Sequence, residues 1–320
     1  MSRRTAWAWG RFLVPVLVLA VLVWRLGTGP FLDGVRTVDA QALAEAVGIA
    51  LLTTLCCAWR WKTVAGGLGV DLSLPAAVAA YYRSQFLNVT LPGGVVGDVH
   101  RGVSHGRDAR DVGRGLRAVA WERSAGQAVQ FVLTVVVLLV LPSPVRSAMP
   151  IVAIAAVVVT LVVVLVARAL PGGERSVPAR VRTALGRDIR DALLLRGAWR
   201  SIALASVLVV AGHAATFVIA ARTAGSTAPL TQMLPIALLA MIGMVLPSAA
   251  GWGPREGVTA WAFGAAGLGV QQGVTTAVVY GVMVFVACLP GAVVLLVAWF
   301  RRIRLPETSP RPLRETAVHA

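Results

Sequence analysis

The sequence predicts an all-α integral membrane protein with about six transmembrane helices, two re-entrant hairpins and an inverted repeat. Hydrophobic residues make up 57% of the 320 residues and the mean hydropathy is +0.77, which is too apolar for a soluble domain. The apolar residues form segments close to the roughly 20 residues that a helix needs to cross a bilayer. Two further apolar segments, one in each half, are broken by Leu-Pro steps and small residues.

Six apolar segments are long enough, or nearly so, to cross the membrane as helices. The first is the weakest, because Arg11 and Arg25 bound it closely. A signal peptide is the alternative, but no small-residue cleavage site follows Trp24, so we expect a retained anchor. The six predicted spans are Phe12–Trp24, Ala40–Trp59, Ala125–Leu141, Pro150–Ala167, Ile202–Ala221 and Val274–Phe300.

Charge orients these spans. The chain has 30 basic and 14 acidic residues, a net charge of +16, and by the positive-inside rule the basic clusters are cytoplasmic. These clusters are the N-terminus, Arg101–Arg117, Arg168–Arg200 and Arg301–Arg314. Both termini are then expected in the cytoplasm. The external connections are Gly27–Asp39, Pro142–Met149 and Arg222–Gln232.

The composition and spacing also argue against several partners. A basic excess spread over the loops of a membrane protein needs no nucleic acid to explain it, and no recognition motif accompanies it. The three cysteines lie within predicted spans, and adjacent Cys56 and Cys57 point to different helix faces, so we expect no disulfide framework. His100 and His105 are not spaced as metal ligands are. We therefore expect no metal and no cofactor.

The first break predicts a hairpin. Pro75–Val96 is expected to enter from the cytoplasm and return, with its tip at Pro92, Gly93 and Gly94. If Pro75–Leu91 crossed fully, the arginines of 101–117 would lie outside, against the charge rule.

The second break predicts a matching hairpin that enters from outside. Its arms are Met233–Leu246 and Glu256–Leu268, each about 20 Å long as a helix. The tip is expected around Ser248, Ala249 and Ala250, within the break that contains Pro247, Gly251 and Gly253. The alternative is two short helices that each cross the membrane. A hairpin and two full spans both return the chain to the side from which it entered, so the topology of the other spans does not distinguish them.

The two halves follow one order of elements. Residues 1–145 and 146–300 each run span, span, hairpin, span, and three spans per half invert the second copy. Residues 1–300 thus form one transmembrane domain in which the two hairpin tips face each other near the midplane. Residues 301–320 are basic and contain prolines, which predicts a disordered cytoplasmic tail.

Between the first hairpin and the third span, Arg107–Trp121 has its arginines at three- and four-residue spacing. This spacing predicts a helix that lies on the membrane surface. It is either an ordinary positive-inside loop or a docking face for anionic lipid headgroups.

Charged residues within the apolar segments are the candidates for the functional site. A charged side chain at the centre of a membrane-spanning helix raises the free energy of insertion by about 2.5–3.5 kcal/mol unless it is paired or hydrated. Gly253-Pro254 also predicts a helix start whose free N–H groups could bind an anion beside Arg255. His213 is either a core histidine or a proton relay. The candidate headgroup-binding residues are Arg83, Asn88, Asp98, Arg101, Glu122, Arg123, Arg255 and Glu256.

These residues carry a resemblance to a known family. The motifs are Tyr82-Arg83 through Asn88, Leu91-Pro92-Gly93-Gly94, Gly97-Asp98, Arg101, Glu122-Arg123 with Gly126, and Gly251 through Gly257. They resemble the lysylphosphatidylglycerol synthase transmembrane family, also called flippase-like or UPF0104 proteins, over nearly the whole chain. The chain departs from that pattern at Pro254, where a small aliphatic residue is expected, and no aminoacyl-transferase domain follows Phe300.

The resemblance implies a multi-pass protein of the inner (plasma) membrane that moves lipids. We expect a flippase-like transporter for a phospholipid or a lipid-linked intermediate, with an anionic or aminoacylated phospholipid as ligand, rather than an enzyme. One alternative is an accessory subunit of a lipid-modifying synthase or glycosyltransferase. The other is a membrane transferase with Asp98 or Glu256 as base, which lacks a recognisable catalytic constellation.

Overall fold

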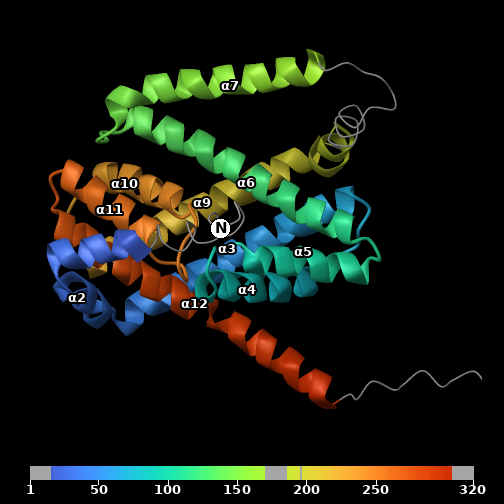
Figure 1. Ribbon diagram of the computed structural model, residues 1–320, viewed down its shortest axis with the longest axis horizontal. Coiled ribbons are helices and arrows are strands. Elements are labelled where there is room, and N and C mark those ends of the chain that lie inside the picture. Colours follow the sequence, from blue (N-terminus) through green and yellow to red (C-terminus); the bar gives the residue numbers. More distant parts are fainter. Residues whose placement is uncertain (1–15, 170–185, 195–196, 305–320) are drawn as a thin grey trace, which may run out of the picture.

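The computed structural model describes residues 16–169, 186–194 and 197–304. Residues 305–320 of the predicted tail and the start of the first predicted span lie outside these residues, whereas residues 301–304, predicted as disordered, continue the last helix. The described chain is helical, and α3 and α9 pack together through its middle (Figure 1). Its helices are Val16–Leu26, α2 (Gly29–Thr37), α3 (Ala40–Gly67), α4 (Leu74–Thr90), α5 (Val96–Asp108), α6 (Val112–Val140), η1 (Arg146–Ala148), α7 (Met149–Ala169), η2 (Ile189–Leu194), α9 (Ala198–Thr223), α10 (Leu230–Gly243), α11 (Pro254–Ala265) and α12 (Val270–Arg304).

Four of these helices, α3, α6, α9 and α12, are long and apolar enough to cross a membrane. They cover the predicted second, third, fifth and sixth spans, and the prediction of an all-α membrane protein is confirmed. Helix α7 coincides with the fourth predicted span and lies at the edge of the bundle, next to α6 (Figure 1).

The connection that follows the first predicted span needs correction. Val16–Leu26 and α2 form a pair bent by 99°, and α2 occupies the connection that the sequence predicted as an external loop. Gly27 has φ +72°, which permits the bend, and Pro30 starts α2. Helix α2 then packs on α12, because Gly34 has no side chain to meet Val278, which a Cβ would approach to 2.8 Å.

The first hairpin consists of α4 and α5, so its returning arm extends well beyond the predicted end at Val96. Helix α5 is polar, yet its glycines let it pack against neighbouring backbone. A Cβ on Gly97 would lie 2.0 Å from the carbonyl oxygen of Ser84 in α4, and one on Gly106 would lie 2.5 Å from Cα of Val112 in α6. The glycines therefore bring one face of α5 into close contact with α4 and α6.

The predicted surface helix Arg107–Trp121 is wrong. Helix α5 ends at Asp108, the chain turns at Arg110 with φ +56°, and Asp111 caps α6 by accepting a hydrogen bond from the Arg114 amide at 2.8 Å. Arg107 therefore belongs to α5, Arg110 to the turn, and Arg114 and Arg117 to α6, which starts 13 residues before the predicted span, at Val112.

The second hairpin consists of α10 and α11, joined by residues 244–253. Both helices are too short to cross a bilayer of about 30 Å unaided, and they pack against each other. The Ala249–Trp252 bridge closes the turn between them.

The two breaks meet inside the molecule. The Gly93 amide donates a hydrogen bond of 2.9 Å to the carbonyl of Ser248, and a Cβ on Gly251 would lie 3.0 Å from the Val89 side chain. Helix α3 links the halves as well, since Ala46 packs in the core of the second half and Trp61 in that of the first. The assignment of the two halves as inverted copies stays a prediction.

Candidate functional site

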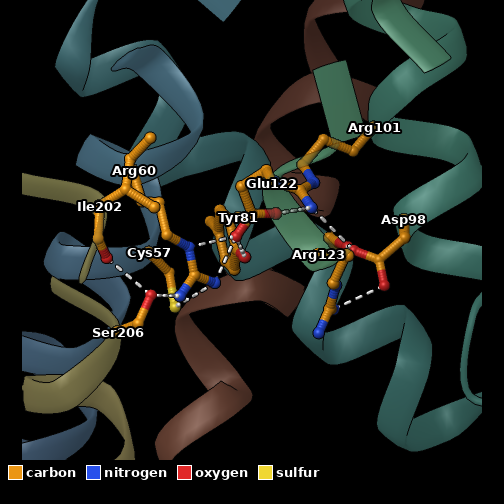
Figure 2. Close-up of polar contacts among 10 residues, drawn as sticks. Cys57, Arg60, Tyr81, Asp98, Arg101, Glu122, Arg123, Ile202 and Ser206 are labelled. Carbon is orange, nitrogen blue, oxygen red and sulfur yellow. Dashed lines mark hydrogen bonds and ion pairs between the residues drawn. The ribbon is translucent and has the colours of Figure 1, made fainter. Parts of the chain in front are cut away.

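A network of buried charged side chains joins four helices of the first half (Figure 2). Its centre is Glu122 on α6, which is completely buried. Oε1 of Glu122 accepts hydrogen bonds from Arg60 Nε on α3 at 2.9 Å and from the Tyr81 hydroxyl on α4 at 2.9 Å. Oε2 accepts one from Arg101 on α5 at 3.1 Å. One carboxylate thus binds three helices to its own.

Asp98 at the start of α5 is the second carboxylate of the network. Its Oδ1 accepts hydrogen bonds from Arg101 at 3.0 Å and from the Ser84 hydroxyl at 3.1 Å. Its Oδ2 accepts from Arg123 at 2.5 Å and from the Asn88 amide at 3.1 Å. The oxygen of the Asn88 side chain accepts from the Gly97 amide at 2.7 Å. These bonds attach the region of the first tip to α6.

Arg101 is enclosed by the network and has no exposed surface. Its guanidinium lies 4.1 Å from the ring centre of Tyr81 and 4.4 Å from that of Trp61. Cation–π contact of this kind replaces part of the hydration that a buried guanidinium loses. Arg123 differs, because 41% of its side chain is exposed. Part of the Arg123 side chain is therefore accessible from outside the protein, although its Nε is buried, whereas Arg101 is not accessible.

The sequence analysis missed Arg60, Tyr81 and Ser206. Arg60 was placed just past a span end, where an arginine is expected to extend to the headgroups, but α3 continues to Gly67 and buries it. Its Nη1 donates to the Ser206 hydroxyl on α9 at 2.8 Å, which joins the network to the second half. Trp61 is completely buried but Trp59 is 42% exposed, so the tryptophans on both sides of Arg60 gave no signal that it is buried.

Arg255 and Glu256 form a separate, local group at the start of α11. The guanidinium of Arg255 binds Glu256 Oε1, with Nε at 2.9 Å, and lies over the rings of Trp252 and Tyr280 at 5.4 and 5.3 Å. Glu256 Oε2 accepts a hydrogen bond of 2.6 Å from the Gly253 amide. The helix start that the sequence suggested as an anion site thus holds the chain's own carboxylate.

The structure brings five of the eight candidate headgroup residues together, namely Asn88, Asp98, Arg101, Glu122 and Arg123. Arg83 is half-buried on α4, two residues from Tyr81.

Among the hairpin residues, Gly93 and Gly94 have φ +99° and +68°, and Gly251 and Gly253 have φ +80° and +115°. Such angles explain why both tips need glycine. Pro92 and Pro247 lie in the two connections beside these glycines.

The fold and the buried charges define a multi-pass α-helical membrane protein with a polar site in its interior. Residues 9–306 match the model of a protein family described as the lysylphosphatidylglycerol synthase TM region, so the chain belongs to this family. Comparison with curated proteins and with solved structures found no match. The family indicates a membrane protein of lipid metabolism or transport.

Proposed function

We propose that the protein is a flippase-like transporter that moves a phospholipid or a lipid-linked intermediate across the bacterial cytoplasmic membrane. The observation that carries the proposal is the charge imbalance of the buried network. Three guanidinium groups, those of Arg60, Arg101 and Arg123, face two carboxylates. One positive charge is left over inside a membrane domain, where a charge is costly unless it is paired. The phosphate of a lipid headgroup would supply the missing negative charge.

Arg123 is the residue through which a headgroup would reach the network. Its side chain is partly exposed, and its guanidinium pairs with Asp98, whose Oδ2 also binds Asn88. A phosphate beside Arg123 would share these N–H groups with Asp98, and a planar guanidinium can hold two phosphate oxygens at once. Asp98 would then be free to meet a cationic headgroup, such as an aminoacylated one.

Exposed apolar side chains border both breaks. Val95, Val96 and Val99, near Asp98, are 42–53% exposed, and Val245 and Leu246 are exposed next to the opposite tip. Acyl chains could stay in the bilayer against these side chains while the headgroup sits at Arg123. Rocking of the halves would separate Gly93 from Ser248 and expose the site to each side of the membrane in turn.

In this proposal the protein transports lipid and is not itself an enzyme, and both termini lie in the cytoplasm, as the basic loops predict. A lipid-modifying synthase or glycosyltransferase would supply its lipid. The alternative is an accessory subunit of such an enzyme that moves no lipid.

The test is movement of fluorescent phosphatidylglycerol between the leaflets of vesicles that contain the purified protein. Arg123→Ala should lower the rate about tenfold or more, the cost of one charge-assisted contact. Arg123→Lys should restore only part of it, because an ammonium group makes no two-pronged contact. Arg190→Ala is the matched control, since Arg190 is 77% exposed on η2 and lies outside the network.

Lysylphosphatidylglycerol measured in parallel shows whether a cationic headgroup is preferred. Normal movement with Arg123→Ala would contradict the proposed headgroup site. Absence of movement with the wild-type protein, together with co-purification of a lipid-modifying enzyme, would favour the accessory subunit.

A further inference from the structure

A small cavity lies where the two halves meet. Its volume is about 50 Å³, which is enough to hold water. Helices α3 and α4 of the first half and α9 and α12 of the second half line it. Most of the lining is apolar, and the polar side chains are those of Thr53, Gln85, His213 and Thr216. The headgroup proposal uses none of these residues.

His213 is the histidine that lines this cavity, and an unperturbed imidazole takes up a proton close to neutral pH. Its Nδ1 forms a hydrogen bond of 3.1 Å with the Tyr280 hydroxyl on α12. The other ring nitrogen, Nε2, has no hydrogen bond to a described residue, and the ring borders the cavity. Water in the cavity would thus have access to one nitrogen while the other is held by α12.

Tyr280 connects His213 to the second hairpin. The Tyr280 ring lies under the guanidinium of Arg255, 5.3 Å from ring centre to Cζ. Arg255 binds Glu256, and Glu256 holds the Gly253 amide at the end of the break. The same break supplies the Ser248 carbonyl that binds Gly93 of the first tip. Direct contacts thus lead from His213 to Gly253, and the backbone of the break continues from Gly253 to Ser248.

The charged and titratable groups around His213 oppose a second positive charge there. Helix α12 presents Tyr280 and Cys288, and Arg255 lies behind Tyr280. The positive charge of Arg123 on α6 also disfavours a positive charge on His213. The polar side chains that α3 and α4 contribute to the cavity are the uncharged Thr53 and Gln85. Helix α10, which packs against α9, contains no ionisable residue. No carboxylate of the described residues offsets a charge on His213. A protonated His213 would therefore strain the closed arrangement and draw in water.

We propose that His213 is a proton-binding site that couples the contact between the two hairpin tips to pH. Protonation makes both ring nitrogens donors, so Tyr280 has to accept, and the added charge lies next to Arg255 across the ring. The α9–α12 contact then loosens, the second break moves, and Gly93 separates from Ser248. The coupling role in lipid movement rests on the function proposed above, whereas proton binding itself does not.

The first experiment measures protonation directly. The full chain has four histidines, so ¹⁵N-histidine spectra in lipid bilayers are simple, and His213→Asn assigns the signal of interest. We expect the His213 imidazole to titrate at a midpoint that Tyr280→Phe shifts, because the Tyr280 hydroxyl is bonded to its Nδ1. A His213 signal that stays in one protonation state between roughly pH 4 and 8 would overturn the proposal.

The second experiment measures the consequence. In vesicles, lipid movement should change about tenfold per pH unit above the midpoint if one proton is required. His213→Asn should lose this dependence, and His100→Asn should keep it. Movement that is independent of pH in the wild-type protein would overturn the coupling while leaving the proposed function intact. Titration of His213 in a protein that moves no lipid would contradict the proposed function and keep the proton site.

Discussion

The charged group around Glu122 and the one around Glu256 differ in the number of helices that the carboxylate binds. Glu122 in the first half binds side chains from α3, α4 and α5, whereas Glu256 in the second half binds its neighbour Arg255 and the amide of Gly253. The first group is an element of tertiary structure and carries an excess of positive charge. The second is neutral and caps one helix. A carboxylate in a membrane domain can thus hold a bundle together or stabilise a single break, and substitution should separate the two roles.

The largest effect is expected at Glu122. Glu122→Gln removes the charge that faces both Arg60 and Arg101, which are almost completely buried. Breaking a buried pair from one side costs about 3–5 kcal/mol, and here two cations lose a partner. The free energy of unfolding in detergent micelles should fall by at least this much. A variant as stable as the wild type would show that the network is hydrated and that the comparison is mistaken.

A smaller loss is expected for Glu256→Gln. The substitution weakens the bond to the Gly253 amide and leaves Arg255 with its two aromatic rings. A lost helix cap costs about 0.5–2 kcal/mol, and the unpaired guanidinium adds to this. The measurement is the same unfolding experiment, with Glu122→Gln alongside. Equal losses in the two variants would mean that the second group also joins helices together.

The smallest effect is expected for Ser206→Ala. This change removes one neutral hydroxyl that accepts from Arg60 at 2.8 Å, while Glu122 still holds the same guanidinium. The expected loss of stability is about 1 kcal/mol. Unfolding of the single variant and of Ser206→Ala combined with Glu122→Gln would measure their coupling. Simple additivity would indicate that Ser206 is not part of the network.

The sequence predicted the membrane class, four spans and both breaks, because each depends on local composition. Asp98 and Glu122 were also predictable as site residues, since a charge in apolar sequence requires a reason. Their partners were harder to predict. Arg60 lies just past the predicted end of the second span, and α5 is a polar helix, so neither was expected in the interior of the protein. Hydropathy measures how polar a segment is, but it does not show which polar groups of other helices will pair with that segment. The path of α6 through Arg114 and Arg117 was missed for the same reason.

The separation of Arg60 from its partners along the chain has a consequence for synthesis. Glu122 follows Arg60 by 62 residues and Ser206 follows it by 146. At about 5–20 residues per second, α3 exists for roughly 3–12 s before its carboxylate partner emerges from the ribosome. During that interval the guanidinium has to remain near the headgroups or inside the insertion machinery. Helix α3 therefore reaches its final depth only after α6 has been made, so the order in which helices enter the bilayer differs from the order in which they settle.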